Sequence, residues 1–239
     1  MKAMNDYLAG VIRLYHTSED LGDFGDITAI SVYRKCTNPL APDSEWTLVD
    51  TKKVITTNDQ NFMFVDYSAR SGESYEYKTI ASGFENGIVV SYEGSKCSVA
   101  SETAGIVIGA GDEYYTLNFN VTYTAQKEYN MAYVRPYYSK YPHAIQNGDA
   151  NFHSGSVSSY FNQMGDNCTV NRGNGYYAEQ IENFLMDGRI KTLKTYDGYV
   201  WKIMIDAPVK REKTNEKGLV FFTFNWHAVA EPSPAGFFA

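Results

Sequence analysis

Histidines and carboxylates are the residues of this chain best suited to acid–base or metal chemistry. The histidines are His16, His143, His153 and His227. A nucleophilic dyad needs one of them beside an activated Ser or Cys, and no known signature of such a pair surrounds any. His143 and His153 share a Tyr- and Asn-rich region with Asp149, but their ten-residue spacing fits no common zinc pattern. We predict no catalytic residue, no metal and no cofactor.

Paired carboxylates would suit the hydrolysis of glycosidic bonds, with aromatic rings to stack on the sugars. Seven aspartates stand beside Gly, Asn, Ser or similar residues, where Asp stabilises turns through local hydrogen bonds. These are Asp23, Asp26, Asp43, Asp59, Asp112, Asp166 and Asp197. The turn interpretation is the stronger one, and the chain is not predicted to be an enzyme.

Composition favours two strand-rich domains. The chain has 239 residues, 44% of them hydrophobic, with 20 Tyr and 13 Phe. Its net charge of −7 and its lack of a long Lys/Arg cluster argue against binding to nucleic acid. The longest apolar stretch, Ala104 to Gly111, is too short to span a membrane. Cys36, Cys97 and Cys168 are too few for a disulfide scaffold, so free thiols are expected, although a Cys36–Cys97 pair stays open.

The first hundred residues contain six short β-type runs separated by turn clusters, which is typical of a β-sandwich. The runs are Val11–Tyr15, Ile27–Tyr33, Trp46–Val49, Asn61–Val65, Ser74–Ile80 and Gly87–Tyr92.

This region resembles a fibronectin type III domain. The matching residues are Ser31–Lys35, Trp46, Phe64–Asp66 and Gly72–Lys78. The resemblance implies that Tyr75 closes a tyrosine corner by hydrogen bonding to upstream backbone, and that Asn86–Gly87 forms the turn of the last hairpin. The usual Trp of the second strand is absent, so Leu14 or Tyr15 would fill its place.

We place the boundary between the domains in the small, turn-prone segment 103–112. Residues 1–102 would then be the first sandwich, 113–233 the second, and 234–239 a tail. A strand through Ile106–Ile108 is the alternative, because three β-favouring apolar residues are rarely left unpacked.

The second half opens with the alternating run Tyr115–Tyr123, which predicts one strand. The segment from Met131 to Phe161 predicts further strands and a long connection. Its turn signals are Tyr141–Pro142, Asn147–Gly148 and Ser154–Gly155.

A helix is predicted over Tyr176–Met186 from the spacing of its apolar residues, with Gly188 as the left-handed residue that closes it. A hairpin over Ile190–Ile205 should follow, with Asp197–Gly198 as a two-residue type I′ loop that fixes the register for Trp201. Leu219–Val229 is predicted as the closing strand, with its aromatic face in the core.

Four tyrosines crowd into Tyr133–Tyr141 beside two cations, more than one sheet face normally hides. They are either ordinary strand residues or a recognition surface, and Tyr supplies contact area at low entropic cost. We predict contact with protein. The interaction residues are Tyr133, Arg135, Tyr137, Tyr138 and Tyr141.

The second half resembles tail or baseplate proteins of long-tailed bacteriophages. The match rests on the order of Tyr141–Pro142, Asn147–Gly148, Ser154–Ser158, Asp187–Lys194, Gly198–Ile205 and Phe222–Trp226. The resemblance implies a C-terminal sandwich with one short helix and a structural role in the virion tail. It also implies synthesis in the bacterial cytoplasm, and as partners other copies of the chain, in a ring or on the tail, and other tail proteins.

Two rival functions remain open. A carbohydrate-binding host-attachment module would stack sugars on exposed rings such as Tyr137, Tyr138 and Trp201. A cell-wall-degrading enzyme is the other.

Overall fold

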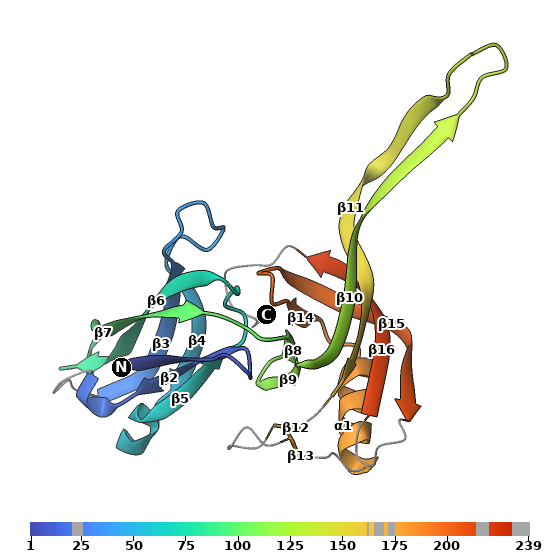
Figure 1. Ribbon diagram of the computed structural model, residues 1–239. Helices are drawn as coiled ribbons and strands as arrows, with labels where there is room; N and C mark the ends of the chain where they lie inside the picture. Colours follow the sequence, from blue (N-terminus) through green and yellow to red (C-terminus); the bar gives the residue numbers. More distant parts are fainter. Residues whose placement is uncertain (21–25, 162, 165–169, 172–174, 214–219, 231–239) are drawn as a thin grey trace.

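The computed structural model describes residues 1–20, 26–161, 163–164, 170–171, 175–213 and 220–230. These residues confirm a mainly β chain with one α-helix. Figure 1 shows two β-structured units side by side and a two-stranded arm that projects from the second. Residues 1–101 are called the first unit and residues 106–230 the second.

The first unit consists of seven strands in two sheets of order β1-β2-β5 and β4-β3-β6-β7. The strands are β1 (Lys2–Asp6), β2 (Val11–His16), β3 (Asp26–Cys36), β4 (Thr47–Lys53), β5 (Phe62–Asp66), β6 (Glu73–Glu85) and β7 (Ile88–Ser101), with 3-10 turns η1 (Ser18–Asp20) and η2 (Thr57–Gln60). Each of the six runs predicted from the sequence overlaps a strand. Buried and less buried residues alternate along β6, so one face of this strand lines the core.

The hairpin between β6 and β7 has the predicted Asn86–Gly87 turn. Glu85 pairs with Ile88, which leaves a two-residue loop, and both loop residues have positive φ, 52° and 80°. This is the backbone that a type I′ turn requires. At the other end of β6, the Tyr75 hydroxyl accepts a hydrogen bond of 2.9 Å from the Arg70 backbone N–H, five residues upstream.

Leu14 is buried in the first core, whereas Tyr15 is exposed. Of the two residues proposed to replace the missing Trp, Leu14 is therefore the one that packs inside.

A buried ion pair crosses between the two sheets of the first unit. Arg34 on β3 donates to Asp66 on β5 at 2.7 Å, and its other guanidinium nitrogen lies 3.2 Å from Asp43. The Asp66 carboxylate also accepts hydrogen bonds from Tyr77 Oη and Ser68 Oγ, each at 2.7 Å. Burial alone would raise the pKa of Asp66, but Arg34 and these hydrogen bonds lower it to about 2.

The second unit is built on one seven-stranded sheet of order β10-β11-β16-β15-β14-β8-β9. Its strands are β8 (Ile106–Ala110), β9 (Glu113–Leu117), β10 (Phe119–Val134), β11 (His143–Tyr160), β14 (Lys191–Lys194), β15 (Val200–Lys213) and β16 (Val220–Ala230); the helix is α1 (Gly175–Met186), and β12 (Gln163–Met164) pairs with β13 (Val170–Asn171). The two end strands, β9 and β10, are joined by the single residue Asn118. The sheet must therefore curl until its ends approach each other.

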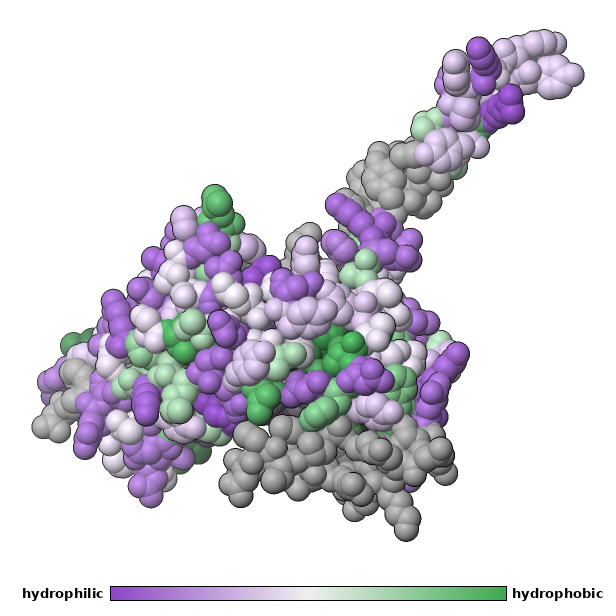
Figure 2. Space-filling model, in the orientation of Figure 1, coloured by the Kyte–Doolittle hydropathy of each residue, from purple (hydrophilic) through white to green (hydrophobic). Residues whose placement is uncertain are grey.

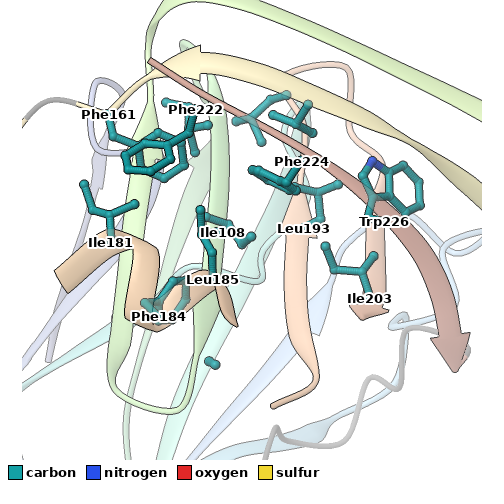
Figure 3. Close-up of a cluster of buried hydrophobic side chains, with 14 of the residues drawn as sticks. Ile108, Phe161, Ile181, Phe184, Leu185, Leu193, Ile203, Phe222, Phe224 and Trp226 are labelled. Carbon is teal, nitrogen blue, oxygen red and sulfur yellow. The ribbon is translucent and has the colours of Figure 1, made fainter. Parts of the chain in front are cut away.

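One apolar core fills the curled sheet, with α1 packed over it (Figure 3). Ile181, Phe184 and Leu185 of the helix are buried against strand residues that include Phe222 and Phe224. These helix residues recur every three to four positions, as expected of an amphipathic helix. The predicted core face of the closing strand is confirmed, because Phe222, Phe224 and Trp226 are all buried.

Three sequence expectations in the second unit are wrong. Residues 106–110 of the expected linker form the buried strand β8, so the alternative of a strand through Ile106–Ile108 is correct. The single strand expected over Tyr115–Tyr123 is broken at Asn118, between the end of β9 and the start of β10, and Asn120 adopts a positive φ of 49° inside β10. The turns expected at Asn147–Gly148 and Ser154–Gly155 lie inside β11.

The helix ends as predicted, with Gly188 at a φ of 75°, but the hairpin after it has a different loop. β14 and β15 pair from Lys191–Ile203 to Lys194–Val200, which leaves five residues between them. The Gly198 N–H donates to Thr195 O, and of the Asp197–Gly198 pair only the glycine has positive φ. A four-residue turn ending in a left-handed glycine therefore replaces the expected type I′ loop.

The two units share a packed boundary. Lys194 of β14 is fully buried and donates through Nζ to Gly10 O at 2.8 Å. The Tyr67 hydroxyl donates to Gly111 O at 2.8 Å, and the Tyr67 ring stacks on Tyr114. These contacts join the first unit to β9, to β14 and to the turn between β8 and β9.

Candidate interaction site

The arm is a two-stranded ribbon that extends beyond the sheet. β16 pairs with β11 only from Ser154 to Tyr160, whereas β10 continues to pair with β11 out to Val134 and His143. We define the arm as 127–134 and 143–153 together with the connecting tip, 135–142. Its paired part is roughly 25 Å long at about 3.4 Å per residue. Figure 1 shows the arm leaving the body of the protein.

The tip is a folded loop with two nearly fully exposed aromatic rings. The Ser139 N–H donates to Pro136 O at 3.0 Å, which closes a turn around Tyr137 and Tyr138. The two rings lie edge to face with centroids 5.0 Å apart, yet their exposed fractions are 93% and 95%. Large rings held at low conformational cost are typical anchors of protein interfaces.

The five residues predicted for interaction come together at this end of the arm. Tyr133 lies near the end of β10 and is 69% exposed; Arg135, Tyr137, Tyr138 and Tyr141 lie in the tip, and Tyr141 is 70% exposed. The structural residues Tyr75, Gly188, Asp197, Gly198 and Trp201 all lie in the two units instead. The interpretation of the tyrosine tract as ordinary strand residues therefore does not hold for the tip.

The tip is cationic, while the rest of the chain is acidic. Arg135 and Lys140 are its charged residues, and no Asp or Glu occurs between Met131 and Pro142. Since the net charge of the chain is −7, the remainder carries −9 when these two cations are set apart. Figure 2 shows hydrophilic surface at the end of the arm, separated from the body by the length of the ribbon.

The root of the arm carries a groove that the sequence did not reveal. It is a hollow of about 630 Å³ on the outer face of the sheet, lined by side chains of β10, β11, β15 and β16. Glu128, Phe152, Ser154, Asp206 and His227 are among the lining residues. The alternation of polar residues at Thr122, Thr124, Gln126 and Glu128 was the available signal, because these side chains share one face of β10.

The groove is held in shape by hydrogen bonds between its own side chains. Ser154 Oγ donates to Glu128 Oε1 at 2.6 Å, and Gln126 Nε2 donates to the same oxygen at 2.7 Å. These bonds lower the pKa of Glu128, so the carboxylate is ionised at neutral pH. His227 Nδ1 lies 2.7 Å from Asp206 Oδ1.

Gly155 brings the strands of the root close together. A Cβ on this residue would lie 1.9 Å from Thr124 O and 3.0 Å from the Trp226 ring. Only glycine fits between this backbone oxygen and the indole, which explains why a residue expected in a turn lies inside β11.

The residues considered for chemistry are dispersed. His143 and His153 lie on β11 ten residues apart, roughly 33 Å along an extended strand. Cys36 and Cys97 are free thiols, and Cys168 lies outside the described residues. Across the part of the chain that the structure describes, no group of three His, Cys, Asp or Glu side chains is arranged to hold a metal ion. No described helix is long and apolar enough to cross a membrane.

Trp201 is not a sugar-stacking platform. It is 7% exposed and packs against Trp226, with ring centroids 5.1 Å apart, so the expectation of an exposed ring at this position is wrong. Its alternating position on β15 places it in the core.

Neither a protein-family model nor a curated protein sequence matches the chain. Two solved structures have low similarity to it. One is a chain of the virion of a native gene transfer agent particle, 12% identical, with a TM-score of 0.32 over 53% of this chain and 92% of that chain. The other is a chain from the tail of an empty gene transfer agent particle with C6 symmetry, 11% identical, with a TM-score of 0.33 over 54% and 92%. Scores this low define neither the fold nor the function of the chain.

Proposed function

We propose that the chain is a structural component of a bacteriophage tail or baseplate, which associates with copies of itself through the arm. The observation that carries this proposal is the arm, a ribbon that ends in two exposed tyrosines whose rings lie edge to face. An isolated two-stranded ribbon is at best marginally stable in water, and it gains stability when another surface packs against it. A second copy would supply that surface.

The architecture of the first unit supports the proposal. Its seven strands divide into sheets of three and four, and β7 leads into the second unit through a short connection. We interpret this unit as fibronectin type III-like, in agreement with the residues of β3, β5 and β6 that resemble this family. In such an assembly it would act as a rigid spacer or an outward-facing decoration. Other tail proteins would be further partners, and the virion the place where the protein acts.

Removal of the arm tests the proposal. Glu128 pairs with Phe152, so replacing 129–151 by Asn-Gly would close β10 and β11 with a two-residue turn. We expect the full chain to form oligomers in mass photometry and rings or stacks in negative-stain images, and the armless variant to lose these species while melting at nearly the same temperature. A full chain that stays monomeric at all accessible concentrations, and binds no other tail protein, would contradict the proposal.

Host-glycan binding is the alternative, since Tyr137 and Tyr138 could also stack on sugars. A glycan array probed with the full chain and with a Tyr137→Ser/Tyr138→Ser variant separates the two functions. Self-association without glycan binding supports the structural role, and tyrosine-dependent glycan binding by a monomer supports attachment.

A further inference from the structure

We infer that the groove at the root of the arm is the docking site for the tip of another copy's arm. This inference rests on the proposed self-association and specifies its contact. The tip supplies two cations and exposed aromatic rings, and the groove supplies two carboxylates and a half-exposed ring. Each copy then has one donor surface and one acceptor surface.

Charge complementarity is the first argument. Arg135 and Lys140 are exposed, and the tip has no carboxylate of its own to neutralise them. The groove contains Glu128 and Asp206, and no Lys or Arg is among its described lining residues. An Arg guanidinium bonds a carboxylate through two parallel N–H donors, which gives strength and direction together.

Aromatic contact is the second argument. The Phe152 ring is 40% exposed in the groove and lies edge to face with His227, at a centroid distance of 6.4 Å. The exposed tyrosine pair of the tip offers ring faces and edges of the same kind. Aromatic pairs contribute about 0.5–1.5 kcal/mol beyond the area that they bury.

Geometry excludes the chain's own tip as the occupant. The ribbon holds this tip roughly 25 Å from the groove, because β10 and β11 pair out to Val134 and His143, with one register shift between Tyr129 and Met131. The occupant must therefore come from a second molecule. When each copy docks its tip into the next, the contacts produce a closed ring or an open stack; when two copies exchange tips, they produce a two-fold dimer.

A charge-swap experiment tests the docking site. Reversing the tip (Arg135→Glu/Lys140→Glu) or the groove (Glu128→Lys/Asp206→Lys) should each weaken self-association at least tenfold in analytical ultracentrifugation. An equimolar mixture of the two variants should recover self-association. The reversed tip of one variant then meets the reversed groove of the other, and the unchanged tip meets the unchanged groove. Glu45→Lys/Glu102→Lys is the control for the groove reversal, with the same change in net charge at exposed positions away from the groove.

The armless variant supplies a second test because it retains both Glu128 and Phe152. When added to the full chain, it should occupy the free tips and shorten the assemblies in proportion to its concentration. The groove-reversed form of the armless variant should not shorten them. This test does not depend on restoring association by mixing two variants. A melting curve of each variant shows whether it is folded.

The outcomes separate the docking site from the proposed function. If the full chain assembles but folded groove variants assemble equally well, the tip docks elsewhere and this inference is overturned, while self-association stands. If the tip reversal weakens assembly and the mixture of folded variants does not recover it, the inference is overturned as well. A full chain that never assembles overturns both.

Discussion

Arg34 and Arg135 lie in opposite surroundings, and the difference separates the body of the protein from its arm. Arg34 is buried, and its guanidinium donates to Asp66, Ser68 and Asp43. Arg135 is exposed at the end of the ribbon, beside tyrosines that are almost fully exposed. Arg34 is paired with carboxylates inside the body, whereas the tip exposes its cations and rings to solvent. Changes in the body should therefore affect folding, and changes in the tip should affect association.

Asp66→Asn should cause the largest loss of folding stability. It removes the charge that balances buried Arg34, and breaking a buried pair in this way costs about 3–5 kcal/mol. Urea denaturation of the variant would measure the loss. Glu45→Gln, the same chemical change at an exposed position, should alter stability by less than about 0.5 kcal/mol. Equal losses of folding stability in the two variants would mean that the buried carboxylate stabilises the fold no more than an exposed one.

Acid should weaken the body through the same carboxylate. The pKa of Asp66 is about 2 in the folded chain and about 4 in an unfolded one, so its stabilising contribution is complete above pH 4 and is lost as the pH falls through 2. The expected loss is about 2–3 kcal/mol. In unfolding titrations between pH 5 and 2, the stability difference between the natural chain and Asp66→Asn should narrow. A constant difference would contradict this assignment.

Gly155→Val tests the junction of arm and body. The side chain would overlap Thr124 O and the Trp226 ring, so the strands of the root must separate, at a cost of about 1–3 kcal/mol. Thermal melting measures the loss of folding stability. Ala125→Val is the matched control, because Ala125 pairs with Gly155 but is exposed. Similar melting temperatures for the two variants would show that the close approach at Gly155 is not needed.

Tyr137→Ser/Tyr138→Ser should have the smallest effect on folding. Neither ring is buried, so the free energy of unfolding should change by less than about 0.5 kcal/mol, while self-association weakens at least tenfold. Denaturation and sedimentation of one sample measure both quantities. Loss of folding stability would show that the tip supports the body, and the contrast between the two regions would fail.

Local sequence signals predicted the elements whose geometry is set within a few residues. The helix to Met186, the left-handed Gly188 and the Asn86–Gly87 turn all follow from nearby side chains and backbone preferences. Asp197–Gly198 looked equivalent to Asn86–Gly87, but its loop is longer. Thr195 and Tyr199 exchange backbone and side-chain hydrogen bonds across it, and this pairing decided the turn.

Features that depend on distant pairing were missed. Arg34, Asp43, Asp66 and Tyr77 are far apart in sequence, so nothing local indicates that they meet. The tyrosine tract marked the tip, yet its projection depends on where β16 stops pairing with β11, about seventy residues later in the chain. The groove has the same origin, because its lining comes from four strands.

Asn118 gives the arm a mechanical connection to the first unit. It joins β9 to β10 without an intervening loop, and its side-chain amide donates to Leu8 O, while Thr116 Oγ1 donates to Ala9 O. A pull on the ribbon is therefore transmitted along β10 to this residue and, through these two bonds, to the backbone between β1 and β2. A force applied at the end of the arm would reach both units, because no flexible loop separates β10 from β9.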